Sequence, residues 1–271
     1  MSIETSTSEK PAATQRMAGE PIWIDLVATD VAKAQAFYGE LFGWEFHDGG
    51  EQYGHYTTVT KDGRAVGGLM GKTPDMGDMP DVWTVYLHVA DARATIAAAA
   101  EANGQVCVDA MDVGDLGVMG VVADPAGAVI GLWEPKEFSG FEKVAEPGAG
   151  AWFELSSTDY EAAVSFYRGV FGWQTETMSD TPDFRYTTLG AGEQARAGIS
   201  DASGVLPDGT PSGWLVYFAV PDTDAAIEKA EALGATLVEG PDDTEWGRLA
   251  HLTDDQGAHF KIMSSDTGCA L

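Results

Sequence analysis

Side chains able to do acid–base, nucleophilic or metal chemistry are sparse in this sequence of 271 residues. Its two cysteines, Cys107 and Cys269, lie far apart and lack the spacing of a zinc site or of a disulfide framework. No pair of histidines has the i, i+4 spacing with a carboxylate neighbour that is typical of helical zinc motifs. The histidines are His47, His55, His88, His251 and His259. Local motifs therefore predict neither a metal site nor thiol chemistry.

Two carboxylates, Asp25 and Glu154, stand at matching positions of a long internal repeat. Ile22–Phe46 aligns with Ala151–Thr175 at an offset of 129, and ten of the 25 positions are identical without a gap. Tryptophans and other rare aromatic residues are among the matches. A period of this length is too long for a solenoid unit, so it indicates two duplicated domains.

The repeat continues beyond this stretch and sets the expected domain boundaries. Tyr56-Thr57-Thr58 recurs as Tyr186-Thr187-Thr188, and Asp124 and Gly127 recur as Asp254 and Gly257. We expect domains over 21–135 and 151–265, joined by a linker over 136–150. Residues 1–20 are polar and have no apolar signal segment, which predicts a disordered tail on a cytoplasmic protein.

The charge balance excludes two classes of partner. Lys and Arg number 15 against 43 Asp and Glu, and the formal net charge is −28. Such a surface repels phosphate backbones and anionic lipid, so we expect no nucleic acid and no membrane partner. The same charge favours solubility and would attract cationic ligands weakly.

Hydrophobic periodicity places these residues on strands and helices. Ile22–Ala28 is an apolar strand, Thr29-Asp30 is a helix start signal, and the helical spacing that follows ends at Gly43. Strands are expected at 44–47, 53–60 and 64–70. The second half of the copy, from residue 82 to residue 133, repeats this order. The predicted fold class is α+β, with four tandem βαβββ modules in two domains.

On these features the chain resembles the vicinal oxygen chelate superfamily, which includes glyoxalase I, bleomycin-resistance proteins and extradiol dioxygenases. The resemblance rests on the helix ending Phe-Tyr-x-x-Leu-Phe-Gly-Trp (Phe37 to Trp44) and on the turn Asp124-Pro125-x-Gly127. It covers nearly everything after residue 20, and two-domain actinobacterial glyoxalase-like proteins are the most similar kind. Members of that kind also act in antibiotic and anthracycline pathways as accessory or drug-binding proteins.

The resemblance implies that each pair of modules forms a cup, often around a divalent metal held by two His and one Glu. Carried over to this chain, the ligand positions are Trp23, Thr84 and Gly131 in copy one, and Trp152, Leu215 and Lys261 in copy two. A fourth position falls near Gly67-Gly68-Leu69. These side chains cannot ligate a divalent metal in the usual way. We therefore predict no metal, no cofactor and no assigned catalytic residue.

Strand alternation predicts aromatic cups that each carry one carboxylate. Such walls suit a planar organic ligand held by stacking, whose ammonium or hydroxyl group the carboxylate could receive. The predicted ligand-binding residues are Trp23, Asp25, Tyr86, His88, Trp133, Trp152, Glu154, Tyr217, His259, Lys261 and Met263. The alternative is that Trp23 and Trp152 are core residues that fill the cups. The paired carboxylates argue against full burial, because a carboxylate is seldom buried without a partner.

Two positions make the cups chemically different. His88 could act as a general base in copy one, or it could be hydrogen-bonded in the cup wall or at its rim, and copy two has Ala219 there. Lys261 could neutralise Glu154 across the cup of copy two, where copy one has Gly131.

The leading functional prediction is a metal-independent protein that binds an aromatic small molecule or secondary metabolite. It would serve as a drug-binding, accessory or self-resistance factor in antibiotic biosynthesis. The alternative is an enzyme, either a glyoxalase-type lyase or isomerase or a hydroxylase or oxygenase component, and a third is a structural protein whose cups are filled. We expect a monomer whose two domains pair within the chain.

Overall fold

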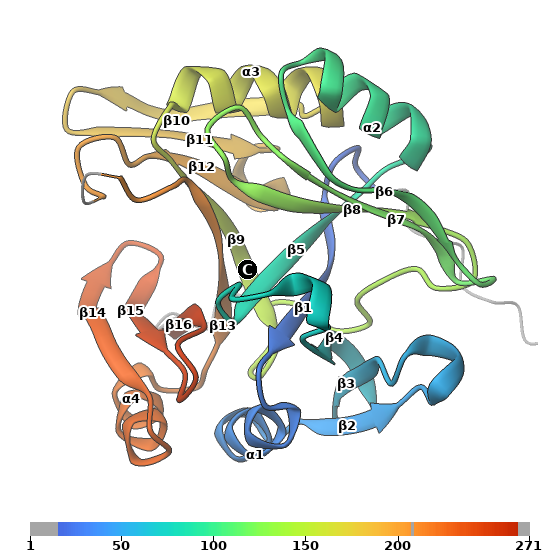
Figure 1. The fold of residues 1–271 in the computed structure, drawn as a ribbon. Coiled ribbons are helices and arrows are strands. Elements are labelled where there is room, and N and C mark those ends of the chain that lie inside the picture. Colours follow the sequence, from blue (N-terminus) through green and yellow to red (C-terminus); the bar gives the residue numbers. More distant parts are fainter. Residues whose placement is uncertain (1–15, 207–208, 265–271) are drawn as a thin grey trace, which may run out of the picture.

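The computed structural model describes residues 16–206 and 209–264, and shows two copies of one fold, each with an eight-stranded mixed sheet (Figure 1). Copy one consists of β1 (Pro21–Ala28), α1 (Val31–Phe42), β2 (Glu45–Asp48), β3 (Thr57–Lys61), β4 (Arg64–Gly71), β5 (Val82–His88), α2 (Ala92–Glu101), β6 (Gln105–Val113), β7 (Gly117–Ala123) and β8 (Val129–Pro135). Copy two consists of β9 (Gly150–Ser157), α3 (Tyr160–Phe171), β10 (Thr175–Thr181), β11 (Phe184–Leu189), β12 (Ala197–Asp201), β13 (Gly213–Ala219), α4 (Thr223–Ala232), β14 (Thr236–Thr244), β15 (Gly247–Thr253) and β16 (His259–Ser264). Short 3-10 helices occupy three loops, at η1 (Glu51–Tyr53), η2 (Pro74–Met76) and η3 (Gly192–Gln194). The predicted α+β fold with four βαβββ modules is confirmed.

The first strands of paired modules lie at the centre of each sheet. The strand order is β2-β3-β4-β1-β5-β8-β7-β6 in copy one and β10-β11-β12-β9-β13-β16-β15-β14 in copy two. β1 pairs antiparallel with β5 and parallel with β4, while β5 pairs parallel with β8. These pairings bring the positions that the resemblance assigns to metal ligands to the middle of one sheet face.

The helices begin and end where their sequence signals predict. The Asp30 side chain accepts from the backbone N–H of Lys33, and the Asp159 side chain accepts from that of Ala162. Both α1 and α3 end at a glycine in the left-handed region, which favours residues without a Cβ. The strand expected from residue 53 is shorter than predicted. Residues 51–53 form η1, and β3 begins only at Thr57, after left-handed residues at Gly54 and His55.

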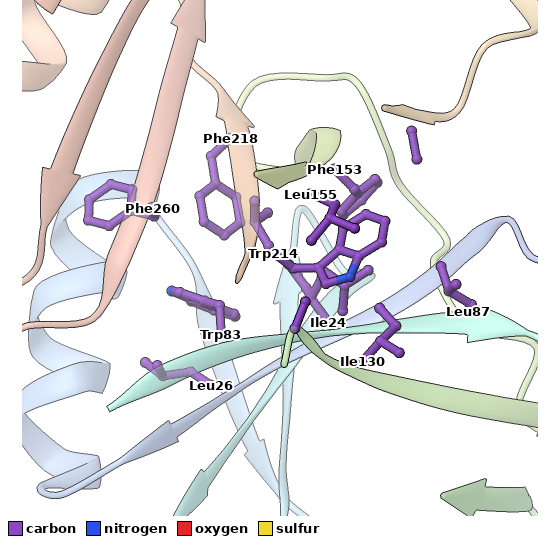
Figure 2. Packing of buried hydrophobic residues seen from close by; sticks show 14 of the residues in the cluster. Ile24, Leu26, Trp83, Leu87, Ile130, Phe153, Leu155, Trp214, Phe218 and Phe260 are labelled. Carbon is purple, nitrogen blue, oxygen red and sulfur yellow. The ribbon is translucent and has the colours of Figure 1, made fainter. Parts of the chain in front are cut away.

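The two sheets pack against each other through the face that also carries the helices. Ile24, Leu26 and Trp83 of copy one meet Leu155, Trp214 and Phe218 of copy two in one buried cluster (Figure 2). Figure 1 shows α2 beside α3 at one end of this core and α1 beside α4 at the other. Alternate residues of β1, including Trp23 and Asp25, face away from this core. Each sheet therefore presents its second face, the cup, on the outside of the pair.

The motif residues that carry the family resemblance join the two copies. The Tyr38 hydroxyl of α1 donates to Asp254 Oδ2 in the copy-two turn at 3.0 Å, and it accepts from Trp83 Nε1 at 3.1 Å. The Trp44 indole donates to Gly148 O, just before β9, at 2.6 Å, and the Trp173 indole donates reciprocally to Gly19 O, just before β1, at 2.9 Å. These aromatic residues hold the domains together, and they stand apart from the cups.

The expected disordered tail over 1–20 is wrong for its last residues, and residues 1–15 lie outside the described part of the chain. The backbone N–H of Gly19 donates to His88 O, while Gly19 O accepts from the Trp173 indole of the other copy. Two domains thus fix this turn, which composition alone does not reveal. None of the helices in residues 16–206 and 209–264 has the length and hydrophobicity of a membrane span. The monomeric state stays a prediction.

Candidate functional site

Cup one is built around the carboxyl group of Asp25. Asp25 and its neighbours Trp23, Tyr86 and Trp133 are each at least nine-tenths buried. The Trp23 indole donates to the Tyr56 hydroxyl at 2.7 Å, and that hydroxyl donates to Asp25 Oδ2 at 3.3 Å. β1 contributes Trp23 and Asp25, β5 contributes Tyr86, β8 contributes Trp133, and Tyr56 immediately precedes β3. The cup therefore holds one carboxyl group among four aromatic rings.

Burial changes the acid–base behaviour of Asp25. Loss of solvation raises the pKa of this carboxyl from 3.8 to about 7, since the charged form is the one that needs water. The Tyr86 and Tyr56 hydroxyls lower the pKa of Asp25, which opposes the effect of burial. Tyr56 does so through a hydrogen bond, whereas the Tyr86 hydroxyl lacks the geometry of a full hydrogen bond. Asp25 Oδ1 is buried and has no hydrogen-bond partner among residues 16–206 and 209–264. The expectation that the carboxylates escape full burial is thus wrong for Asp25.

Cup two repeats the same constellation with a longer acid and an added base. The Trp152 indole donates to the Tyr186 hydroxyl at 2.8 Å, and that hydroxyl donates to Glu154 Oε2 at 2.9 Å. The Tyr217 hydroxyl donates to Glu154 Oε1 at 2.9 Å. Lys261 Nζ lies 3.6 Å from the same oxygen and donates to the Tyr217 hydroxyl at 2.8 Å. The predicted Lys261–Glu154 ion pair is present, so this carboxylate is satisfied on both oxygens.

Protonation in cup two follows from burial and charge. Desolvation raises the pKa of Tyr217 and of Tyr186, and the Glu154 charge raises both further, so both phenols stay protonated and serve as donors. His251, which pairs with Lys261 across β15 and β16, has its pKa lowered to about 4 by desolvation and then by the charges of Lys261 and His259. His251 is therefore a neutral imidazole at pH 7.

Three glycines allow the tyrosines to enter the cups. An added Cβ at Gly68 in β4 would overlap the Tyr56 hydroxyl, and one at Gly198 in β12 would overlap the Tyr186 hydroxyl. Gly131 in β8 likewise leaves room for the Tyr86 ring, which lies directly over it. Each close approach needs a residue with no side chain.

The tyrosines that enter the cups also occupy positions where a divalent metal would be held. The resemblance would place ligands at Trp23, at Gly131 and near Gly68, but the first is an indole and the other two positions are covered by tyrosine rings. In copy two the corresponding last-strand residue is Lys261, a cation that donates into the site. No group of three or more His, Cys, Asp or Glu side chains in the described residues is arranged to hold a metal ion. The donor set does not fit the metal of the family.

Among the described residues, the cups differ in how far they are covered. Residues 136–141, which we call the strap, follow β8 and cross the mouth of cup one. Phe138 packs edge-on against Trp23 with ring centroids 4.7 Å apart, and its carbonyl accepts from the Trp133 indole at 3.0 Å. In cup two, Trp152 and Lys261 remain partly exposed in the described structure. The segment equivalent to the strap would follow residue 264, outside the described residues.

Three predicted site residues take no part in the hydrogen bonds that join tryptophan, tyrosine and carboxylate in the two cups. His88 is half-buried at the end of β5, with Nδ1 3.3 Å from Met17 O. His259 is exposed, with Nδ1 3.0 Å from His251 Nε2, and Met263 is buried with its carbonyl accepting from Val220 N. The other eight predicted residues gather in the two cups.

Sequence reasoning missed three residues that the cups contain or adjoin. Tyr56 and Tyr186 link tryptophan to carboxylate, and His251 lies beside Lys261. A signal for the two tyrosines was present, because the Tyr-Thr-Thr segment recurs at corresponding positions of both copies.

Sequence comparison identifies relatives of this chain. The model of the Glyoxalase/Bleomycin resistance protein/Dioxygenase superfamily matches residues 21–132 and again residues 151–262. The protein named "Putative glyoxylase CFP32" of Mycobacterium tuberculosis (strain CDC 1551 / Oshkosh) is 36% identical over 259 residues, which are 93% of this chain and 97% of that protein. Anthracycline biosynthesis protein DnrV of Streptomyces peucetius is 35% identical over 270 residues, which are 92% of this chain and 94% of that protein.

A solved structure shows the same fold at low identity. The Mn(II)-bound glyoxalase from Novosphingobium aromaticivorans superposes with a TM-score of 0.62 at 16% identity, over 91% of this chain and 82% of that one. At this identity the likeness concerns the fold alone.

Proposed function

The chain belongs to the Glyoxalase/Bleomycin resistance protein/Dioxygenase superfamily, and from that premise we propose that it binds an aromatic small molecule in its cups without a metal ion. The observation that carries the proposal is the Trp–Tyr–carboxylate–Tyr constellation, which stands in both copies at the centre of the sheet face. Indole and phenol rings offer flat apolar walls, and the carboxylates supply polar anchors that fix a ligand's orientation.

We propose a role in the biosynthesis of, or resistance to, a secondary metabolite. Relatives over nearly the full length of the chain include a protein named for anthracycline biosynthesis, which supports this biological setting. A protein that binds such a molecule by stacking would act as a carrier, an accessory factor or a self-resistance factor.

Fluorescence titration tests the proposal directly. Trp152 is partly exposed and belongs to the cup-two network, so a ligand stacking there should quench its emission. The panel should comprise planar aromatic compounds of one to four fused rings, each with and without hydroxyl groups. We expect saturable quenching and a rise in Tm with at least one of them.

Matched variants assign the signal to the cups. Trp152→Phe and Glu154→Gln should weaken binding at least tenfold, because the first replaces the indole wall with a smaller ring and the second removes the charge of the polar anchor. Trp246→Phe serves as the control, since Trp246 is exposed in the turn between β14 and β15. If no compound changes the emission or the Tm, the proposal is wrong.

The rival function is an enzyme, a glyoxalase-type lyase or isomerase or a hydroxylase or oxygenase component. One observation favours acid–base chemistry in copy two. Lys261 donates a hydrogen bond to the Tyr217 hydroxyl, and that hydroxyl donates to Glu154. Turnover of a bound aromatic compound by the wild-type protein, lost in Tyr217→Phe, would establish this second candidate. Unchanged ligand recovered after prolonged incubation would rule it out for that ligand.

A further inference from the structure

One difference between the two cups lies on the last strand of each sheet, beside the second tyrosine. Gly131 of β8 pairs with Tyr86, and Lys261 of β16 pairs with Tyr217, in the same parallel register. The duplicated frame therefore places Lys261 in cup two where cup one has a glycine covered by the Tyr86 ring. Comparing the two cups therefore shows what the Lys261 side chain contributes.

The Lys261 ammonium marks a cation site inside cup two. Its Nζ lies 2.8 Å from the Tyr217 hydroxyl, 3.6 Å from Glu154 Oε1 and 4.8 Å from the centre of the Tyr217 ring. A carboxylate, a hydroxyl oxygen and the face of an aromatic ring together form a receptor for an organic ammonium group. Here the chain's own side chain occupies that receptor.

Cup one contains the equivalent groups without a cation from the chain. Asp25 replaces Glu154, Tyr86 replaces Tyr217 and Trp23 replaces Trp152, while Trp133 adds a second indole. Asp25 Oδ1 is buried and finds no hydrogen-bond partner in the described part of the chain. A buried acceptor left unpaired destabilises the folded state, and an incoming N–H donor would remove that destabilisation.

We propose that cup one binds the ammonium group of an aromatic amine at Asp25 Oδ1, and that Lys261 takes the place of this group in cup two. The inference rests on the proposed function, since it names the charge class of the ligand that an aromatic cup would hold. The ligand enters when the strap moves Phe138 off Trp23, because these rings are in contact in the closed cup. The overall negative charge of the chain favours the approach of a cation.

Benzylamine is a suitable probe, with benzyl alcohol as its uncharged counterpart. Calorimetric titration at pH 7.5 should give one benzylamine site per chain in the wild-type protein, with benzyl alcohol at least tenfold weaker. Asp25→Asn should reduce benzylamine affinity at least tenfold. Binding should also strengthen between pH 6 and pH 8, because an ammonium group prefers the ionised Asp25.

Two exchanges between the copies test the role of Lys261. Lys261→Met removes the resident ammonium and leaves Glu154 without it, so a second benzylamine site should appear. Gly131→Lys introduces an ammonium into cup one and should abolish the first site, with Gly131→Ala reporting the steric effect on the Tyr86 ring alone. If both Gly131 variants lose binding, displacement of the Tyr86 ring explains the loss. The number of benzylamine sites in Lys261→Met then decides whether Lys261 takes the place of a ligand ammonium.

The outcomes separate this inference from the proposed function. Equal affinity for benzylamine and benzyl alcohol, or a single unchanged site in Lys261→Met, would overturn the ammonium assignment while the cups remain aromatic binding sites. Failure of every aromatic compound in the fluorescence panel, charged or neutral, would instead overturn the proposed function itself.

Discussion

Asp25 should make the stability of the protein depend on pH, and Asp25→Asn should remove that dependence. The native chain keeps a proton on Asp25 up to about pH 7, whereas the unfolded chain releases it near pH 3.8. The native state therefore binds more protons in this interval, and its stability must fall as pH rises from about 4 to about 7. The difference between the two pKa values corresponds to about 4 kcal/mol, of which more than half falls between pH 5 and pH 8.

Urea unfolding at pH 5 and pH 8 measures this contribution. Relative to wild type, Asp25→Asn should gain about 2–3 kcal/mol more at pH 8 than at pH 5, because the amide has no charge to desolvate. Glu154→Gln is the matched control in cup two. It leaves Lys261 without its carboxylate, so we expect it to destabilise the chain at both pH values. An Asp25→Asn effect that is the same at pH 5 and pH 8 would mean that burial does not raise the pKa of Asp25.

Three further variants test other parts of the structure. Tyr38→Phe removes the hydroxyl that links the two copies, and chemical unfolding should show a loss of about 1–3 kcal/mol; no loss would mean that the link is not needed. Gly68→Ala should cost about 1–3 kcal/mol in the same assay, because its Cβ displaces Tyr56, and a wild-type midpoint would contradict the close approach. Phe138→Ala opens the strap, so stopped-flow measurements should show faster benzylamine association; an unchanged rate would mean that the strap does not cover the entrance.

The fold was predictable because its signals are local and occur more than once. Thr29-Asp30 before an apolar helical pattern, and Gly43 after it, define the ends of α1, and the same pattern recurs in copy two at α3. A duplicated sequence also allows each assignment to be checked against its counterpart. Strand boundaries were predicted less accurately where residues with left-handed backbone intervene, as they do before β3.

The site was only partly predictable, because its decisive contacts are long-range. Alternation along β1 correctly directs Trp23 and Asp25 to one face, but it does not reveal that Tyr56 reaches over Gly68 to join them. The strap also escaped prediction, since linker composition carries no information about where Phe138 packs. In the same way, Asp254 looks like a turn residue until the Tyr38 hydroxyl, 216 positions away, is found to donate to it.

The most direct test of metal-independent aromatic binding is a native mass spectrum of the untagged protein, recorded with and without a compound that quenches its fluorescence. We expect a chain without bound metal that gains the mass of the organic ligand, and that loses this adduct in the Asp25→Asn, Glu154→Gln double variant. One tightly held Ni, Zn, Fe or Mn per chain, required for the ligand to bind, would contradict it.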